Sequence, residues 1–393
     1  MSTSAPLLFR QYFHPPAIAA GLAAVLIGYS SSAVIIFQAA RAAGASTEEI
    51  GSWMMALGIG MGLTTIGLSL RYKMPIITAW STPGAALLAT SLEGISMSAA
   101  IGAFIFSAIL ITLSGISGWF ERIIDRIPLP LAAAMLAGIL FQFGVDAFLS
   151  LQSRFGLVLA MFAVYLIAKK LVPRYTILLV LIVGLLWCQF QDLLDFSSFT
   201  LAVNAPQWVT PSFSLSALIG VGIPLYVVTM VSQNIPGIAV LRTAGYRAPI
   251  SPIISWTGIA TLILAPFGGF AINLAAITAA ICTGPEAHAD SSKRYIAGLS
   301  TGVFYLLLGI FGSAIAALFA AFPTEFVVAL AGLALLSTIA NSLYTAVSDD
   351  TAREAAVITF VVTASGISLF GIGAAFWGLI AGGVANFVFS KRK

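Results

Sequence analysis

Apolar stretches long enough to cross a lipid bilayer follow one another along almost the whole chain, with only short polar breaks between them. A helix of about 20 apolar residues covers the roughly 30 Å hydrocarbon core of a membrane. Charged residues make up 8% of the 393 residues, whereas a soluble domain has about a quarter. The sequence therefore predicts an all-α polytopic membrane protein embedded in the lipid bilayer, and it excludes a water-soluble globule.

The sparse polar residues also exclude several functions. The net charge of +4 is spread over the polar breaks and forms no basic stripe, so no nucleic acid partner is expected. Cys188 and Cys282 lie far apart in apolar runs and match no zinc or disulfide spacing. No array of acid, base, nucleophile or metal ligand occurs within the apolar stretches. We therefore predict neither an enzyme nor a metal or cofactor site.

Fourteen membrane segments explain the hydropathy and the charges together. Twelve are long spans, expected at 17–38, 50–70, 97–119, 129–148, 157–168, 177–190, 215–241, 250–266, 295–319, 325–343, 356–370 and 374–389. Two shorter segments, 74–91 and 267–283, begin with Pro, Gly and polar residues and only then become helical in pattern. Fourteen crossings place nearly all Lys and Arg residues, with Arg41 and Arg154 as exceptions, on the cytoplasmic side, as the positive-inside rule requires. Both termini are then cytoplasmic.

The two halves of the chain carry traces of an internal repeat. Residues 1–190 and 215–393 hold seven segments each, joined by an extracytoplasmic linker at 191–214 that contains no Lys or Arg. Seven crossings reverse the direction of the second half, so similarity between the halves indicates an inverted repeat. Aligned pairs include Arg41 with Arg242, Pro75 with Pro266, and Thr82 with Asn273. We therefore predict two inverted seven-segment repeats.

Segments three and ten are each predicted to contain a half helix. Pro83 favours the first turn of a helix, which Ser81 or Thr82 would cap. In segment ten, paired glycines that include Gly269 loosen the backbone, and Asn273 would cap a helix from 274 onward. Two helix N-termini that face each other at membrane depth would offer free N–H groups to an anion. A pair of ordinary Pro and Gly kinks is the alternative.

Polar residues inside segments one and eight are candidates for the same site. Gln233 and Asn234 precede a Pro-Gly helix breaker in segment eight. Their amides can donate hydrogen bonds to a carboxylate without the cost of burying a cation. Tyr29 and Ser31 occupy the symmetry-related place in segment one. The alternative is that these side chains join neighbouring helices.

Titratable residues are few and lie near the ends of the segments. Glu93 ends segment three and Asp146 ends segment five, and each is either a buried proton carrier or a solvated helix end. The cluster GPEAHAD at 284–290 contains a single His, so we interpret it as a loop network or gate rather than a metal site. GxxxG pairs at 298–302 and 378–382 predict close helix packing.

Three strings resemble the benzoate/proton symporter family of bacterial inner membranes, and the resemblance covers essentially the whole chain. They are AWSTPGA at 79–85, QNIPG at 233–237, and NLAAITAAIC at 273–282 followed by GPEAH. That family is similar to nucleobase permeases and to the sulfate-transporter group. The resemblance implies a seven-plus-seven inverted repeat divided into a core domain and a gate domain, commonly dimeric, in a bacterial inner membrane.

The same resemblance implies a substrate site between the half helices of segments three and ten, beside segments one and eight. Nucleobase permeases carry acidic residues where the alignment places Gln233 and Phe270. Amide donors and an aromatic wall of Trp80 and Phe270 would instead suit an aromatic carboxylate. The expected binding residues are Tyr29, Ser31, Trp80, Ser81, Thr82, Gln233, Asn234, Gly269, Phe270 and Asn273.

The expected function is import of benzoate or a related aromatic carboxylate together with protons. Transport would use alternating access, with the core moving elevator-like against the gate of a homodimer. The carboxylate of the substrate would carry the proton or have its charge compensated in the site, and Glu93 is the alternative carrier. The same fold carrying a nucleobase or an inorganic anion, or an anion channel, is the alternative function.

Overall fold

The computed structural model describes residues 14–123, 129–195, 205–285, 287–312, 314–315, 317, 321–367, 369 and 374–390. The described chain is helical apart from one two-stranded sheet and short connections. The regular α-helices are α2 (Pro15–Ala42), α3 (Thr47–Tyr72), α4 (Thr82–Ser91), α5 (Met97–Ile116), α6 (Trp119–Ile123), α7 (Leu129–Leu149), α8 (Phe155–Leu171), α9 (Thr176–Phe190), α13 (Ile250–Leu264), α14 (Ile277–Thr283), α15 (Tyr295–Ile310), α17 (Thr324–Val347), α18 (Arg353–Ala364) and α19 (Ala374–Ser390). The strands are β1 (Thr78–Trp80) and β2 (Ile272–Leu274).

Many of these helices have the length and composition of membrane spans. Six described helical runs qualify on their own: Thr47–Tyr72, Met97–Ile116, Leu129–Leu149, Leu215–Arg242, Ile250–Phe267 and Thr324–Val347. Helix α2 is a seventh if its two parts, Pro15–Tyr29 and Ser32–Ala42, form one span. The prediction of an all-α polytopic membrane protein is therefore confirmed, whereas the number of fourteen segments stays a prediction.

Helix α2 bends by 42° between Tyr29 and Ser32. The Ser32 hydroxyl donates a hydrogen bond to the Gly28 carbonyl at 2.8 Å, four residues earlier in the helix. A serine that bonds back to the preceding turn in this way competes with the helical ladder and favours a bend. The bend lies at the polar residues of segment one, which include the predicted binding residues Tyr29 and Ser31.

The polar cluster of segment eight does not break its helix, contrary to the sequence-based prediction. The run consists of α10 (Leu215–Ala217), a π-helical turn (Leu218–Gly222), α11 (Ile223–Thr229), a second π-helical turn (Met230–Asn234) and α12 (Ile235–Thr243). Pro224 and Pro236 each lie in the first turn after a π-helical stretch. A wider π turn absorbs the missing N–H and the bulk of the proline ring, so the chain stays helical.

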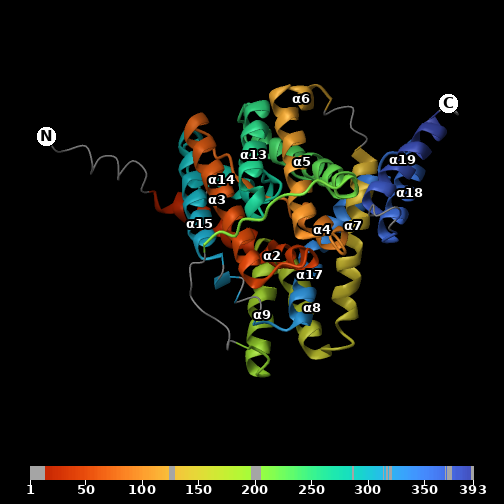
Figure 1. Cartoon of the computed structure of the whole chain (residues 1–393). Helices are drawn as coiled ribbons and strands as arrows, with labels where there is room; N and C mark the ends of the chain where they lie inside the picture. The colour runs from red at the N-terminus through yellow and green to blue at the C-terminus, as the bar shows by residue number, and fades with distance from the viewer. Residues whose placement is uncertain are drawn as a thin grey trace.

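Three long-range helix pairs organise the molecule: α3 packs on α15, α5 on α13, and α7 on α17. Figure 1 shows α3 and α15 together at one side and α18 and α19 together near the C-terminus at the other. Helices α3 and α15 approach so closely that a Cβ on Gly58 would lie 2.5 Å from the Gly309 Cα. The glycines at 298 and 302 face α3, and those at 378 and 382 face α18, so the predicted close packing is confirmed.

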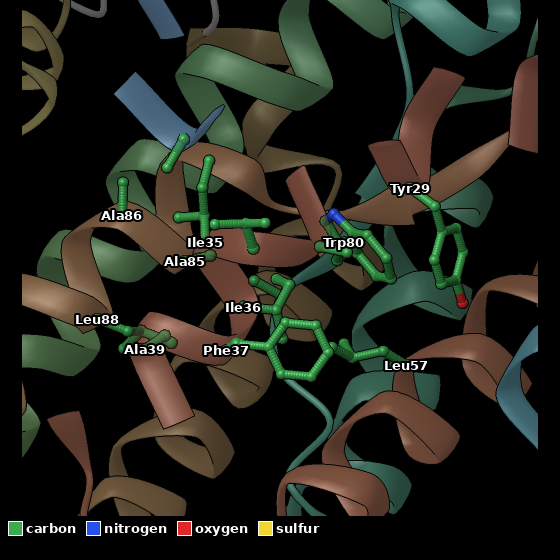
Figure 2. Close-up of a cluster of buried hydrophobic side chains, with 14 of the residues drawn as sticks. Tyr29, Ile35, Ile36, Phe37, Ala39, Leu57, Trp80, Ala85, Ala86 and Leu88 are labelled. Atoms are coloured by element: carbon green, nitrogen blue, oxygen red, sulfur yellow. The ribbon is translucent and has the colours of Figure 1, made fainter. Parts of the chain in front are cut away.

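A fully apolar cluster lies where the second half of α2 meets α3, β1 and α4 (Figure 2). Ile35 and Ile36 of α2 are fully buried there, as are Ala85 and Ala86 of α4. The rings of Tyr29 and Trp80, which carry a hydroxyl and an indole N–H, lie side by side at the edge of this cluster. The apolar packing therefore fixes α2 against α4 directly beside these two rings.

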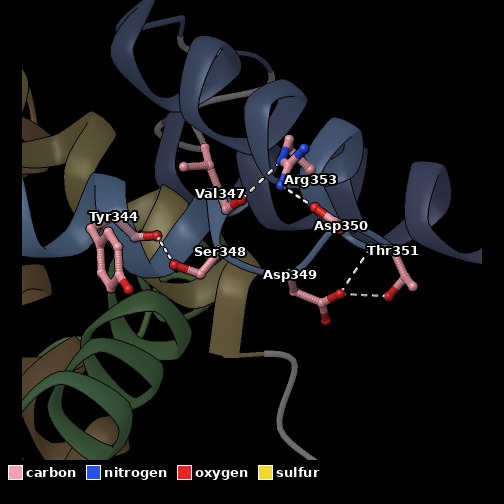
Figure 3. A network of polar contacts seen from close by, with 7 residues as sticks. All are labelled: Tyr344, Val347, Ser348, Asp349, Asp350, Thr351 and Arg353. Atoms are coloured by element: carbon pink, nitrogen blue, oxygen red, sulfur yellow. Dashed lines mark hydrogen bonds and ion pairs between the residues drawn. The ribbon is translucent and has the colours of Figure 1, made fainter.

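The turn between α17 and α18 is held by charged and polar groups (Figure 3). Arg353 pairs with Asp350 and donates from Nε to the Val347 carbonyl at 2.9 Å. Asp349 accepts hydrogen bonds from the backbone N–H and the hydroxyl of Thr351. Because the last carbonyls of a helix have no partner within it, the bond from Arg353 stabilises the end of α17.

Candidate substrate site

The two short segments that the sequence singled out meet as an antiparallel pair of strands. Thr78 pairs with Leu274, and Trp80 pairs with Ile272. The pairing extends by one bond at each end, from the Ser81 N–H to the Ala271 carbonyl at 3.1 Å and from the Ala275 N–H to the Ile77 carbonyl at 2.9 Å. Each strand is followed by a short helix, α4 after β1 and α14 after β2, so both helices begin beside the same small sheet.

Helix α4 is capped as the sequence predicts. The Ser81 side chain accepts a hydrogen bond from the Gly84 N–H at 3.0 Å, and Pro83 lies in the first turn. Ser81 is fully buried. Ser81 rather than Thr82 is therefore the cap, and its hydroxyl satisfies one of the free donors at the start of the helix.

Helix α14 differs from the prediction. The helix begins at Ile277 instead of 274, and Asn273 belongs to β2, where its Nδ2 donates to the Ala271 carbonyl at 2.7 Å. Ala276 occupies the N-cap position, and no described side chain caps this helix. The prediction of Asn273 as a cap was wrong because pairing with β1 keeps 272–274 extended and delays the helix.

Two other predicted binding residues of the tenth segment, Gly269 and Phe270, lie in the stretch just before β2. Gly268 has φ 90°, and a Cβ at this position would collide with the Trp53 ring. Phe270 is fully buried against Trp53 and Phe104, with ring centroids at 5.9 and 5.6 Å. Gly269 donates its N–H to the Leu264 carbonyl at 3.0 Å. These residues form a closed aromatic plug (Trp53, Phe104 and Phe270) rather than a cavity wall.

A cavity of about 760 Å³ lies beside the strands. One wall comes from α2, from the starts of α4 and α14, from the π-helical turn at Met230–Asn234 and from α15; the other comes from α7, α8, α9 and α17. Four predicted binding residues line it: Tyr29, Trp80, Thr82 and Gln233. Ser32, Lys169, Thr278 and Tyr305 also line it and had not been predicted.

Three aromatic rings lie together in the wall of this cavity. The Tyr29 ring contacts the Trp80 ring edge-on with centroids 4.7 Å apart, and the Tyr305 ring centroid lies 6.2 Å from that of Tyr29. Trp80 donates from Nε1 to the Ser32 hydroxyl at 2.8 Å, which fixes its ring. The Tyr29 hydroxyl is buried and has no hydrogen-bond partner within the described part of the chain. A buried hydroxyl without a partner is costly, so a bound molecule that reached this group would gain a favourable hydrogen bond.

The remaining predicted residues lie behind the cavity wall or away from it. Asn234 is fully buried and accepts from the Leu274 N–H at 3.0 Å, so it holds the end of β2. The cavity lining does not include Ser81, Gly269, Phe270 or Asn273, which make the contacts described above. The side chain of Ser31 lies outside the described residues. Glu93 is exposed in the turn that follows α4.

The described lining residues include one charged side chain and no carboxylate or histidine. The charge belongs to Lys169, whose Nζ donates to the Ser337 hydroxyl at 2.8 Å. Lys169 directly follows the predicted span 157–168, and the fourteen predicted crossings place it among the basic residues of the cytoplasmic side. Tyr305 gave no signal, since it follows Phe304 in a largely apolar run and no polar cluster or helix breaker adjoins it.

The described part of the cluster at 284–290 forms a hydrogen-bonded loop, as one of the two interpretations expected. His288 accepts from the Asp290 N–H at 3.0 Å, and Arg294 donates to the His288 and Thr283 carbonyls at 2.8 Å each. The His288 ring stacks on His14 at the start of α2, with centroids 4.2 Å apart. No group of metal-ligating side chains is found among the described residues. The loop therefore ties α14 to α2.

Solved structures with this fold define the class of protein. The transmembrane domain of a cyanobacterium bicarbonate transporter, BicA, aligns over 97% of both chains with a TM-score of 0.62 and 13% identity. The SLC26A9 structure aligns over 95% of this chain and 66% of its own, with a TM-score of 0.63 and 14% identity. The chain therefore has the fold of these membrane transport proteins.

Sequence comparison then gives the family. The benzoate membrane transport protein family, BenE, matches residues 11–388. A benzoate membrane transport protein of Acinetobacter baylyi is 43% identical over 98% of both chains. The inner membrane protein YdcO of Escherichia coli is 51% identical over 95% of this chain and 96% of its own. The chain belongs to the benzoate membrane transport family and is a membrane transporter, not an enzyme.

Proposed function

We propose that this protein imports benzoate or a related aromatic carboxylate together with protons, by alternating access. The observation that carries the proposal is the composition of the cavity. Three aromatic rings, Tyr29, Trp80 and Tyr305, share its wall with hydrogen-bond donors and with the cation of Lys169, and the described lining contains no carboxylate. A planar aromatic anion needs an apolar slot for its ring and donors for its carboxylate.

The two parts of such a substrate have separate places in the cavity. The ring suits the space beside Tyr29 and Trp80, where edge-on aromatic contacts are favourable. The carboxylate suits the donors that also line the cavity: the Tyr29 hydroxyl, the Thr278 hydroxyl and the Gln233 amide. The first residues of α14, which lack a side-chain cap, lie in the same wall.

Proton coupling through the substrate itself is our preferred mechanism. The described lining contains no Asp, Glu or His that could carry a proton through the cavity. Glu93, the alternative carrier, is exposed and follows the end of α4, outside the lining. A carboxylic acid titrates near pH 4.3 in water, and a site that desolvates the anion raises that value, so benzoate can bring its own proton.

The architecture we propose has fourteen segments in two inverted repeats, residues 1–190 and 215–393, joined by an extracytoplasmic linker at 191–214. The pairs α3 with α15, α5 with α13 and α7 with α17 support it, because each joins one element from each half. Segments one to four and eight to eleven would form the core, and the others the gate of a homodimer. The short helices α4 and α14 would be the two half helices.

Orientation follows from the charges. With both termini on the cytoplasmic side of a bacterial inner membrane, the cavity walls at the start of α7, the end of α8 and the end of α17 face the cytoplasm. The aromatic plug lies on the opposite side. On this assignment the described conformation is open to the cytoplasm, and the elevator-like movement would carry β1, β2 and their helices past the gate.

Uptake of radiolabelled benzoate into proteoliposomes tests the proposal. An inward proton gradient should stimulate saturable uptake, and unlabelled benzoate should block it while uracil, sulfate and bicarbonate do not. Competition by uracil, sulfate or bicarbonate would instead indicate a nucleobase or inorganic anion carrier. Flux linear in benzoate concentration would indicate a channel, and absence of benzoate uptake in folded protein would contradict the proposed substrate.

A further inference from the structure

Lys169 and Lys170 are neighbours in the last turn of α8, but only Lys169 lines the cavity. The Lys169 ammonium donates to the Ser337 hydroxyl on α17 at 2.8 Å. Ser337 lies on one face of α17 with Asn341 and Thr345, at four-residue spacing, and all three line the cavity. We call these three residues the α17 polar face.

The charge of Lys169 is not neutralised by its surroundings in the described chain. The two ion pairs found among the described residues, Lys293 with Asp290 and Arg353 with Asp350, leave it out. Its hydrogen-bond partner, Ser337, is a neutral hydroxyl that orients the ammonium without cancelling its charge. A single cation in a cavity with apolar walls raises the local concentration of anions.

We propose that Lys169 is a specificity-determining residue that selects anionic over neutral aromatic ligands on the open side of the cavity, with Ser337 as its positioning residue. The inference deepens the proposed function and rests on it for the identity of the anion. In the import direction of the proposed function, the carboxylate passes from the aromatic rings to Lys169 and the α17 polar face on its way to the cytoplasm. Lys170, which has the same charge one residue further along, does not contribute.

Kinetics of matched variants test this assignment. K169Q should raise the KM for benzoate that enters from the cytoplasmic side of the protein by about tenfold with little change in Vmax, because the cation acts on encounter and binding at that side. K169R should retain most of the affinity, S337A should show an intermediate KM, and K170Q should behave as wild type. Equal effects of K169Q and K170Q, or no effect of K169Q, would overturn the proposal.

Ionic strength separates an electrostatic role from a structural one. Added salt screens a charge that is exposed in a water-filled cavity. The wild-type KM should therefore rise with salt, and that dependence should be weaker in K169Q and unchanged in K170Q. A KM shift in K169Q with the wild-type salt dependence would mean that the substitution only disturbs packing.

Chemical modification adds a readout that does not depend on benzoate transport, namely the rate at which a new cysteine is modified. The variants K169C and K170C are treated with 2-aminoethyl methanethiosulfonate, which attaches an amine to the new cysteine and so restores a cation. The native Cys188 and Cys282 are buried, so the reagent should act on the new cysteine. The reagent should restore uptake in K169C only, and benzoate should slow the modification of K169C but not of K170C. If the wild type does not transport benzoate, the proposed substrate fails, and protection of K169C by bicarbonate or sulfate still supports an anion-selecting lysine. No protection by any of the three anions overturns it.

Discussion

The two segments that form the small sheet, β1 with α4 and β2 with α14, both begin with a strand but differ in how the helix after it starts. After β1 the helix begins at once, and the buried Ser81 hydroxyl binds the Gly84 N–H at 3.0 Å. After β2 the chain stays extended for longer, and α14 begins with Ala276 at the cap position and without a side-chain cap in the described structure. A side chain satisfies one donor at the start of the first helix, whereas no described side chain caps the second.

On the proposed function, this difference gives the two segments separate tasks. Ala275, Ala276 and Thr278 line the cavity at the uncapped start of α14, where free donors would meet a carboxylate. The segment of β1 and α4 contributes the Trp80 ring, which donates from Nε1 to the Ser32 hydroxyl at 2.8 Å. The proposed site would therefore hold the ring and the carboxylate of the substrate on different sides.

Placing a carboxylate at the uncapped start should have the largest effect. In A276D the new side chain would cap α14 and also repel an anionic substrate, so we expect the KM for benzoate to rise by more than about tenfold. The thermal midpoint should be equal to or above that of the wild type. A276S, which caps without charge, should change the KM less. A wild-type KM in A276D would contradict the proposed carboxylate position.

Removing the unpaired hydroxyl of Tyr29 should have the next largest effect. Y29F deletes a buried group that has no hydrogen-bond partner in the described chain, so its thermal stability should match the wild type. If the hydroxyl donates to the carboxylate, the KM should rise by about fivefold, in line with one hydrogen bond. Y344F, at an exposed position on α17, is the control. An unchanged KM in Y29F would remove Tyr29 from the donor set.

Loss of the side-chain cap of α4 should affect stability rather than affinity. S81A leaves the start of α4 without its side-chain bond, at a cost of about 1 kcal/mol. Thermal unfolding in detergent measures this loss, and the KM of the folded fraction should stay near the wild-type value. S96A removes the longer cap bond of α5, 3.3 Å to the Ala99 N–H, and should cost less. Equal stability of S81A and wild type would show that the cap contributes nothing.

The smallest effect concerns the stacked histidines that tie α2 to the loop after α14. Partial burial lowers the pKa of His14, and the nearby His288 and Lys293 lower it further. A pKa below the unfolded value of about 6.5 means that this histidine stabilises the fold above that pH, and that the contribution is lost as the pH falls through the lower folded pKa.

Thermal unfolding at pH 7.5 and pH 5.5 measures this contribution. The variant H14N keeps a good N-cap for α2 but cannot be protonated, so its midpoint should fall less than that of the wild type over this interval. We expect the difference to be about 1 °C. The same fall in both proteins would show that another group controls the pH dependence.

Local chemistry was predictable from the sequence, and non-local pairing was not. The apolar runs gave the membrane class, and the Ser-Thr-Pro-Gly string gave the cap of α4. Asn273 looked equally suited to capping, but its strand partner lies almost 200 residues earlier in the chain, at Ala79, and that pairing keeps it extended. Capping depends on three or four neighbouring residues, whereas strand pairing depends on the whole fold.

The candidate site shows the same division. Trp80 and Gln233 were predicted to bind the substrate because of their side-chain types, and both line the cavity. Phe270 was predicted for the same reason, but it lies in the aromatic plug. Its surroundings come from Trp53 and Phe104, on helices that no local pattern connects to segment ten. Lys169 resembled an ordinary loop lysine until the packing of α8 on α17 placed it at the cavity.

The most direct test is to locate a bound substrate by crystallography with 4-bromobenzoate, whose bromine gives an anomalous signal. We predict one strong peak inside the cavity beside the Tyr29 and Trp80 rings, with the carboxylate directed toward Thr278 and the start of α14. A peak outside this cavity, or the carboxylate directed toward Ser81 and α4, would contradict the proposed division of tasks between the two segments.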